Sequence, residues 1–316
     1  MSHHPPHYPA PPAAVLRSCH QRHSSLHWQR LAIFGVLYFG AASTAVWLAA
    51  QASAGAWYNW LLVIPFYLLA AASLHGISLF THEAVHGTLC ENVKLNYALG
   101  AVCAWPVLQN FSAYRVLHLD HHAHLGDDGD PDHYANYTRW TWMVFTLNWL
   151  RLLVGYPVYI VAIPILAWRQ GTVRDRIGIA AEVLAVVGIA VAVILSGVPW
   201  NWLLHGWLMP MVFINTMVNI RGMSQHTLLE HATDEVQGTR SILTGPLVRY
   251  FMCNENYHLE HHLYPGVPWH HLPELHQALR EDLTAKGAPY ISSYSAFVFE
   301  FLIHSLRRSP LGWHRH

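Results

Sequence analysis

Histidines gather in three short clusters along this chain, and the spacing within each cluster places its members on one face of a helix. The clusters are His82 with His86, His118 with His121 and His122, and His258 with His261 and His262. Side chains three or four residues apart are neighbours on a helix surface. Each cluster can therefore point its imidazoles at one spot. The chain has 26 histidines against 18 lysines and arginines, so it is rich in a side chain that binds metals when neutral.

The eight clustered imidazoles are more ligands than one metal ion accepts. A zinc ion in a structural site takes four ligands, so the three clusters together predict two metal ions. Imidazole suits iron, zinc, copper and nickel, and no cysteine or methionine lies inside the clusters. In an apolar chain such as this one, a pair of nitrogen-ligated metals indicates iron and dioxygen chemistry. The composition alone leaves copper open.

The first cluster also allows a different enzyme. His82-Glu83-Ala84-Val85-His86 matches the HExxH pattern of zinc proteases, in which Glu83 would act as general base. This hypothesis leaves the other two clusters without a purpose. A metal transporter or sensor is a third hypothesis, but it needs a polar pathway through the membrane, and the apolar segments contain almost no polar residues. Metal analysis separates the two enzymes, because one binds iron and the other zinc.

The composition points to a membrane protein. Of the 316 residues, 53% are hydrophobic and only 11% are charged, whereas an ordinary soluble domain has about 25% charged residues. Too few charges are present to cover a water-facing protein of this size. The net charge of zero also excludes a nucleic-acid-binding protein, which needs a basic face.

Four segments have the length and polarity of membrane helices, which need about 20 apolar residues. They are approximately residues 31–53, 57–79, 177–197 and 200–220, and Glu182 is the only charged residue inside them. Arginines flank these segments on the side of the histidine clusters, and this side faces the cytoplasm by the positive-inside rule. We therefore predict an all-α protein with four transmembrane helices and a cytoplasmic, histidine-rich helical cap.

The remaining segments are assigned by their polarity. Residues 95–113 and 140–168 are apolar but interrupted by polar residues and prolines, and we expect them to be helices in the membrane interface. Residues 1–28 are rich in proline, histidine and serine, which predicts a disordered tail. Residues 29–316 would then form a single membrane domain.

The clusters and their contexts resemble a known family. The segments THEAVHG, HLDHH followed by GDDGDPDHY, and NENYHLEHHLYPGVPWHHLP are similar to the three histidine boxes of the membrane fatty acid desaturase superfamily, which includes carotenoid hydroxylases and ketolases. The resemblance covers roughly residues 30–280. It implies two non-haem iron ions bound by the boxes, with O2 as co-substrate. It also implies that all boxes reach one site, so an even number of membrane crossings separates them.

The resemblance adds a ninth ligand. The family tends to place another histidine after the fourth span, in an Arg-x4-His context, and Arg221-Gly-Met-Ser-Gln-His226 is similar. His226 is therefore the expected ninth ligand, and His231 is its rival.

Several polar residues near the boxes are candidates to orient the ligands. A ligating imidazole usually donates its other N–H to a carboxylate or carbonyl. The candidate carboxylates are Glu83, Asp120, Asp130, Asp132 and Glu260. Arg240 would pair with one of these acids. Asn256 could hold a metal-bound water, but a structural role is the preferred interpretation.

The resemblance implies an integral-membrane, O2-dependent oxidoreductase that acts on a long apolar chain from the bilayer. Fatty acyl desaturation is the preferred reaction, and hydroxylation or ketolation of a lipid or carotenoid is the alternative. The sequence contains no cytochrome b5-like segment and no iron–sulfur cysteine cluster. We therefore expect a separate electron donor of the ferredoxin or cytochrome b5 type.

Overall fold

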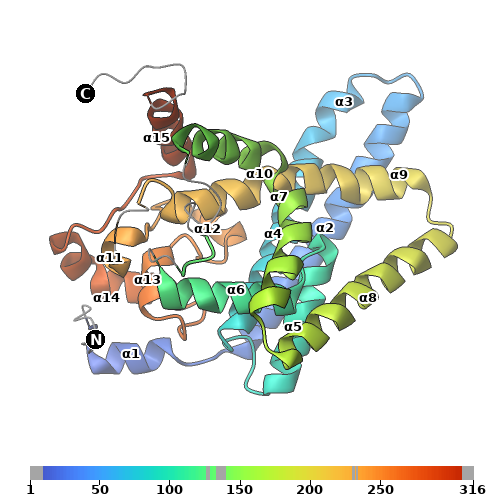
Figure 1. Cartoon of the computed structure of the whole chain (residues 1–316). Coiled ribbons are helices and arrows are strands. Elements are labelled where there is room, and N and C mark those ends of the chain that lie inside the picture. The colour runs from blue at the N-terminus through green and yellow to red at the C-terminus, as the bar shows by residue number, and fades with distance from the viewer. Residues whose placement is uncertain (1–9, 126–128, 133–139, 230–231, 233, 308–316) are drawn as a thin grey trace.

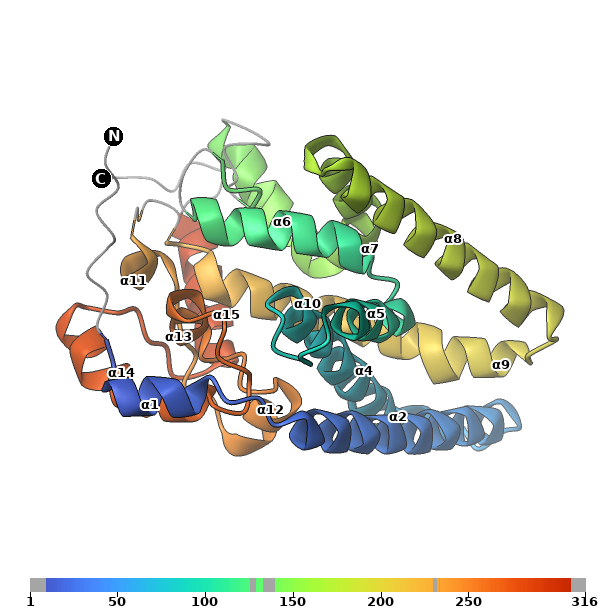
Figure 2. The same cartoon turned by 90° about the horizontal axis from the view of Figure 1, so that it is seen from below.

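The computed structural model describes residues 10–125, 129–132, 140–229, 232 and 234–307. Within these ranges the chain is helical and forms no strand, and one isolated parallel bridge joins Ile242 to Ile291. The predicted all-α class is therefore confirmed. In both views the long helices extend to one side of the molecule, and short helices gather on the other side (Figures 1 and 2).

Five helical segments in the described ranges are long and apolar enough to cross a membrane. They are α2 (Ser24–Ser53), α3 with α4 (Asn59–Leu62 and Ile64–Val85), α7 (Thr141–Gln170), α8 (Val173–Leu195), and α9 (Trp200–Leu203) continued by a π-helical turn (Leu204–Leu208) into α10 (Met209–His226). Four of these overlap the predicted spans, and α7 is additional.

Large apolar side chains cover the outer faces of these helices. Val36 and Phe39 on α2 are 73% and 70% exposed, and Leu184 and Leu195 on α8 are 70% and 79% exposed. Soluble monomers rarely expose apolar patches of this extent. Such faces suit contact with lipid acyl chains.

The placement of α7 relative to the membrane stays a prediction. A helix in the membrane interface is expected over residues 140–168, and α7 is one continuous helix there, with Pro157 and Pro164 inside it. Its part from Thr146 to Gln170 has the length and apolar character of a membrane span. The number of four transmembrane helices therefore stays a prediction.

The continuity of α7 depends on a side chain from α10. Pro157 has no N–H, so it leaves the carbonyl of Leu153 without its helical partner. The Asn215 side chain replaces that bond, because its Nδ2 donates to the carbonyls of Leu152 and Leu153 at 2.9 and 3.0 Å. Its Oδ1 accepts the N–H of Tyr156 at 2.9 Å. Asn215 thus joins α7 to α10 at the point where the proline interrupts α7.

Residues 95–113 divide into short elements. They belong to α5 (Val93–Ala104), a 3-10 turn (Trp105–Val107) and the start of α6 (Phe111–His124), and Leu108 between them has a left-handed φ of 59°. None of these elements is long enough to span, as the sequence predicts. The Asn110 side chain caps α6 by accepting the N–H of Ala113 at 2.9 Å.

The segment 1–28 is not a tail throughout. Residues 1–9 lie outside the described residues, but α1 spans Ala13–Cys19 and α2 already begins at Ser24. Cys19 is fully buried in an apolar cluster with residues of α14 (Leu272–Ala285). The proline- and histidine-rich composition predicts disorder, whereas the short apolar run AAVL of α1 is ordered by packing against α14.

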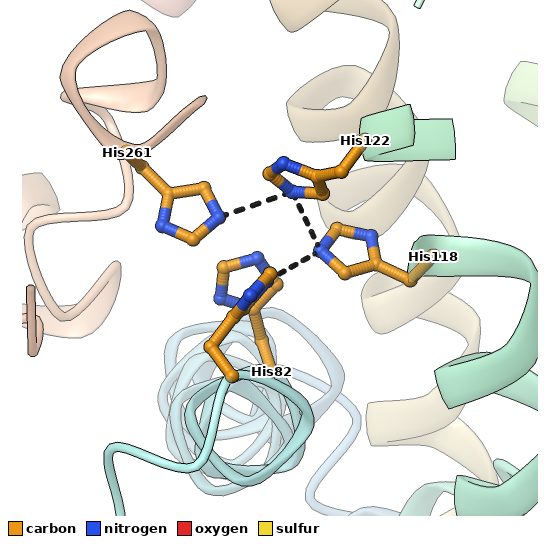
Figure 3. Close-up of side chains that lie close together, drawn as sticks. His82, His118, His122 and His261 are labelled. Atoms are coloured by element: carbon orange, nitrogen blue, oxygen red, sulfur yellow. Dashed lines mark hydrogen bonds between the residues drawn. The ribbon is translucent and has the colours of Figure 1, made fainter. Parts of the chain in front are cut away.

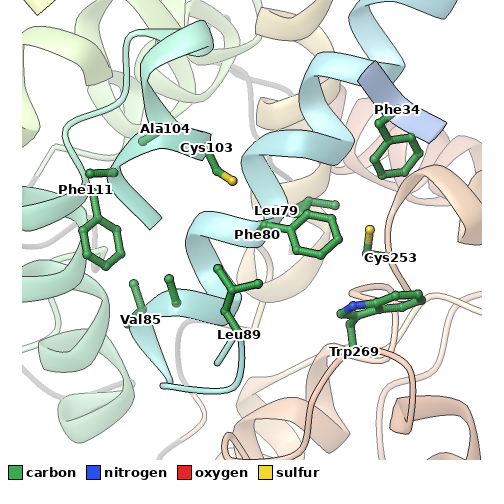
Figure 4. Packing of buried hydrophobic residues seen from close by; sticks show 12 residues of the cluster. Phe34, Leu79, Phe80, Val85, Leu89, Cys103, Ala104, Phe111, Cys253 and Trp269 are labelled. Atoms are coloured by element: carbon green, nitrogen blue, oxygen red, sulfur yellow. The ribbon is translucent and has the colours of Figure 1, made fainter. Parts of the chain in front are cut away.

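The short helices complete the cap. They are α11 (Glu235–Gly238), α12 (Pro246–Phe251), α13 (His258–Leu263), α14 and α15 (Tyr294–Arg307). An apolar core connects this cap to the membrane helices through Phe34, Phe80, Phe111 and Trp269, which are buried together (Figure 4). Truncation of such a phenylalanine to alanine typically costs about 3–5 kcal/mol. The core therefore holds the end of α4 against α2, α5 and the turn that follows α13.

Candidate metal centre

Nine histidines from distant parts of the chain direct their rings toward one region between α4, α6, α10 and α13. His82 lies in the last turn of α4 and His86 caps that helix. Three histidines lie in the second half of α6, three lie on α13, and His226 is the last residue of α10. These are the nine residues that the sequence predicts as metal ligands.

Five of the nine form one group, in which the ring nitrogens that could bind a metal lie within 4.8 Å of one another: His82, His86, His118, His122 and His261. The Nε2 atom of His118 lies 3.0 Å from that of His86 and 3.1 Å from that of His122. The Nε2 atoms of His261 and His122 are 3.3 Å apart. Figure 3 shows four of these rings facing one another.

The other four histidines form a second group beside the first. His121, His226 and His262 have ring nitrogens within 4.8 Å of one another. The Nε2 atom of His258 lies 3.1 Å from those of both His226 and His262. The rings of His122 and His262 stack with centroids 4.1 Å apart, so the two groups adjoin. The nine imidazoles are thus divided five and four between two neighbouring centres.

The protonation of the rings fits a cation between them. The Nδ1–H of His121 donates to Asp130 at 2.8 Å, and the Nδ1–H of His226 donates to the carbonyl of Gly238 at 3.0 Å. A neutral imidazole carries only one ring proton, so this assignment leaves a lone pair on each Nε2. These two Nε2 atoms lie 3.3 Å apart. Facing lone pairs repel, and a metal ion held between them removes the repulsion.

The electrostatic surroundings favour neutral rings. Burial is the largest cause that lowers the pKa of five imidazoles well below the usual value, and neighbouring imidazoles lower it further: His86, His118, His258, His261 and His262. The same causes lower the pKa of His122 to about 2. His121 is the exception: burial lowers its pKa, but the hydrogen bond that it donates to Asp130 and the charges of Asp132 and Asp130 raise the pKa above its usual value. Neutral imidazole is the form that binds metal.

Local sequence ends α4 at the first histidine box. Gly87 has a left-handed φ of 69°, a conformation that glycine adopts without a steric penalty. Its N–H donates to the carbonyl of Ala84 at 3.2 Å, and the N–H of Thr88 donates to that of Glu83 at 3.0 Å. This pair of bonds is the Schellman motif that closes a helix. The box therefore lies at the last turn of an apolar helix, at the edge of the cap.

A buried carboxylate from α8 holds the N-terminal end of α6, and the histidines lie near the other end of this helix. Glu182 accepts the hydroxyl of Ser112 at 2.5 Å and its backbone N–H at 3.1 Å, and it also accepts the hydroxyl of Tyr97 at 3.1 Å. A negative charge is favourable at a helix N-terminus. The helices approach closely there, since a Cβ on Gly178 would lie 2.5 Å from the Ser112 hydroxyl oxygen. The one charged residue in the predicted spans thus anchors the helix that carries the second box.

Two of the predicted carboxylates lie beside a ligand candidate. Asp130 is buried and accepts the Nδ1–H of His121. Asp132 is exposed, and its backbone N–H donates to the Asp130 carboxylate at 2.9 Å. Asp130 therefore orients His121, and Asp132 supports Asp130.

Sequence reasoning missed the carboxylate beside the first box. Glu255 is completely buried, and its Oε1 lies 2.9 Å from Nδ1 of His82. Its other oxygen lies 4.0 Å from the Arg221 guanidinium. Glu255 precedes His258 by three residues in the segment NENYH, and it is not among the carboxylates predicted to orient a ligand. The Gly238 carbonyl that orients His226 was also missed, since a backbone group leaves no signal in the sequence.

Other predicted acids do not contact a ligand candidate. Asp120 lies 3.0 Å from the exposed His124 on the outer face of α6. Glu260 points away from the three histidines of α13 and accepts bonds from Ser241, His276 and Tyr290 at 2.5, 2.6 and 3.2 Å. Glu260 therefore attaches α13 to the surrounding cap. Successive side chains of a helix are rotated by about 100°, so an acid one or two residues from the ligands points away from their common face.

Glu83 likewise has partners outside the nine histidines. Its Oε2 accepts the hydroxyl of Thr88 at 2.6 Å and the N–H of Trp269 at 3.3 Å, although it also lies within 4.8 Å of His82 and Glu255. The carboxylate joins the first box to the turn after α13. A carboxylate held in this way is not free to act as the base of a protease.

Arg240 and Asn256 hold backbone groups. Arg240 donates to the carbonyls of Ser224 and Thr227 at 2.8 and 3.2 Å, at the end of α10 that carries His226. Asn256 donates from Nδ2 to the carbonyl of Ile242 at 2.9 Å, as expected for a structural role. Its Oδ1 is buried and has no hydrogen-bond partner in the described part of the chain. His231 lies outside the described residues.

Comparison with known proteins agrees with this geometry. The sequence model of the family described as fatty acid desaturase matches residues 58–294. Dihydrorhizobitoxine desaturase of Bradyrhizobium elkanii is 29% identical over 270 residues, which are 75% of this chain and 72% of that protein. A beta-carotene ketolase of Paracoccus sp. is 26% identical over 209 residues, 63% of this chain and 72% of that protein. An sn-1 acyl-lipid omega-3 desaturase (ferredoxin) of Synechocystis sp. is 23% identical over 255 residues, 70% and 68% of the two chains.

The chain therefore belongs to the fatty acid desaturase family. The predicted resemblance is confirmed. Membership, together with the long apolar helices and the grouped histidines, makes the protein an integral-membrane oxidoreductase.

Proposed function

We propose that this protein is a non-haem di-iron, O2-dependent oxidase that introduces a double bond into a fatty acyl chain. The observation that carries the proposal is the division of nine imidazoles into two adjoining groups beside apolar helices. The family match supports the same class of reaction. A pair of nitrogen-ligated metals next to an apolar phase suits oxidation of a substrate that enters from the bilayer.

In this proposal the residues of the chain hold, orient and shield the metals. Two bound iron ions would supply the oxidising power that removes hydrogen from an unactivated methylene. The imidazoles offer five and four nitrogen donors. Asp130 and the Gly238 carbonyl accept hydrogen bonds from the outer ring nitrogens of His121 and His226, and a Glu255 oxygen lies 2.9 Å from that of His82. Fixed ring orientation raises ligand basicity and metal affinity. The burial of α13 excludes water from one side of the centre.

The proposed reaction balances only with an external electron donor. The acyl chain loses two hydrogens and O2 becomes two waters, which requires two further electrons and two protons. One relative is named as a ferredoxin desaturase. We therefore propose a separate carrier of the ferredoxin or cytochrome b5 type, which docks on the cap at the cytoplasmic side.

Hydroxylation or ketolation of a lipid or carotenoid is the second candidate. It is supported by the similarity to a beta-carotene ketolase over 209 residues. The two reactions share the loss of the first hydrogen and differ in whether a second hydrogen leaves or oxygen is inserted. Expression in a host of known lipid and carotenoid content, followed by mass spectrometry, distinguishes the products. Desaturation removes two hydrogens, hydroxylation adds one oxygen, and ketolation adds one oxygen and removes two hydrogens.

The test of the ligand assignment uses one histidine from each group. His121→Ala and His261→Ala should each lower iron content and abolish product formation. His124→Ala is a matched control, because His124 lies on the same helix as His121 but pairs with Asp120 at the surface. Turnover that persists in either of the first two variants, with iron unchanged, would refute the assignment.

A zinc protease is not supported. His82 and His86 share their group with three further histidines from α6 and α13, and Glu83 bonds to Thr88 and the Trp269 backbone. A zinc protease needs three protein ligands around one zinc ion, an open fourth position, and a general base that is free.

A further inference from the structure

A third group of histidines, separate from the nine-histidine centre, lies where the N-terminal helices meet the turn after α13. His23 precedes α2, and His270 and His271 lie in the turn before α14. The ring nitrogens that these three residues offer lie within 4.8 Å of one another. The ring centroids of His23 lie 5.5 and 5.6 Å from those of His270 and His271, which are 4.6 Å apart. These separations are similar to those within the nine-histidine centre, such as 5.1 Å between His86 and His118.

The available nitrogens of this group lack other partners. Both ring nitrogens of His270 and Nε2 of His271 are buried and make no hydrogen bond within the described ranges, although the Gln21 backbone lies near the His270 ring. Leaving a buried polar atom unpaired costs about 1–3 kcal/mol. A metal ion bound by Nε2 of His271 and by one ring nitrogen of His270 would remove that cost at both of these atoms.

A carboxylate orients one of the three rings. The Nδ1–H of His271 donates to Oε2 of Glu274 at 3.1 Å, which leaves Nε2 as the free lone pair. The other oxygen of Glu274 accepts the hydroxyl of Ser18 from α1 at 3.2 Å. An acid that fixes the tautomer of a histidine is the usual arrangement behind a zinc ligand.

We propose that His23, His270 and His271 bind a divalent zinc-like ion, with a water in the fourth position. Three imidazoles with one open position form a known zinc coordination set. The ion would join α2 to the turn after α13, across more than two hundred residues of chain.

The place of this site in the fold indicates a structural role. The neighbouring Trp269 donates its backbone N–H to Glu83 in the first box at 3.3 Å, and its indole N–H donates to His27 at 3.0 Å. Asn254 donates to the Trp269 carbonyl at 2.9 Å. The turn is therefore connected to the first and third boxes, and a metal that holds it would stabilise the cap without taking part in oxidation.

The test measures zinc and iron in the same sample. The full chain is purified in detergent with iron loaded, in a background in which three N-terminal histidines that could also bind zinc are replaced by alanine: His3, His4 and His7. This parent chain should bind one zinc equivalent more than the same chain with His23→Ala or with His271→Ala, at equal iron content. Zinc should also raise the melting temperature of the parent and leave that of His23→Ala unchanged.

The matched control is His20→Ala. His20 is exposed close to the site in sequence, and its Nδ1 contacts the carbonyl of Leu16 at 2.8 Å, outside the group of three. This variant should bind zinc as the parent does. His23 is exposed, so its replacement leaves the buried core intact and a folded variant is expected. Equal zinc binding by the parent and His23→Ala, or no zinc binding by the parent, overturns the proposal and leaves the proposed oxidase activity unaffected.

Discussion

At the scale of single residues, the sequence predicts which histidines meet but, apart from Asp130, not which groups orient them. The spacing of HLDHH and HLEHH determines a common helical face, so six box histidines could be assigned without a structure. The orienting groups come from outside that pattern. Glu255 and the Gly238 carbonyl reach His82 and His226 only through the folded cap, whereas Glu260 lies inside a box and faces away from it.

Replacement of Glu255 should weaken the first group of ligands. Glu255→Ala removes the carboxylate 2.9 Å from Nδ1 of His82, so this ring loses the partner that fixes its orientation. Loss of such a partner typically lowers metal affinity or activity about 10–100-fold. Iron affinity measured by chelator competition should fall within this range. Glu255→Gln should retain more affinity because its amide keeps a polar oxygen beside Nδ1 of His82, and Asp120→Ala, at the exposed pair with His124, should change nothing. An unchanged affinity in Glu255→Ala contradicts the role.

At the scale of elements, composition and periodicity predict where the long apolar helices lie. They do not predict the hydrogen bonds by which one helix supports another. The segments near 31–53, 57–79, 177–197 and 200–220 are continuous apolar runs, and the structure has helices there. Pro157 and Pro164 lie inside α7 without ending it. The hydrogen bonds that replace the one lost at Pro157 come from Asn215, almost sixty residues later. A local sequence pattern cannot predict such a bond.

Asn215→Leu should therefore destabilise the pair of helices that positions His226. The substitution removes the side-chain partner of the carbonyls of Leu152 and Leu153 and of the N–H of Tyr156. Each unpaired buried group costs about 1–3 kcal/mol. The melting temperature in detergent should fall, and iron retention should fall with it. Asn201→Leu, at an exposed position at the start of α9, is the control and should leave both unchanged. Equal melting temperatures for the two variants would show that Asn215 does not repair α7.

Glu182 offers a second test at this scale. Glu182→Leu removes the acceptor for Ser112 and Tyr97 at the start of α6, the helix that carries three ligand candidates. Hydrogen bonds to a charged group are worth about 1.5–3 kcal/mol each. We expect a lower melting temperature and partial loss of iron. Glu182→Gln keeps an acceptor oxygen and should restore most of both; identical behaviour of the two variants would argue against a hydrogen-bonding role.

At the scale of the whole molecule, the meeting of distant histidines constrains the topology. His122 on α6 and His226 on α10 belong to adjoining groups, so an even number of crossings separates them. Only two of the three candidate segments α7, α8 and α9–α10 can then cross. The positive-inside rule and this parity together support the prediction that α7 lies at the membrane interface and the cap faces the cytoplasm.

Cysteine labelling tests this topology. Gln170→Cys lies at the end of α7 and Val198→Cys lies between α8 and α9, and both positions are exposed. A membrane-impermeant maleimide applied to intact cells should label Val198→Cys and leave Gln170→Cys unlabelled until the cells are opened. The parent chain, with its four native cysteines, gives the background. Labelling of Gln170→Cys from outside would show that α7 crosses the membrane.

The most direct test of the metal centre is the metal content of the purified full-length protein, measured by elemental analysis. The division of nine imidazoles into groups of five and four predicts about two iron ions per chain, lost on chelation together with product formation. A preparation that is active with a single zinc ion, or with no metal in this centre, would contradict the account.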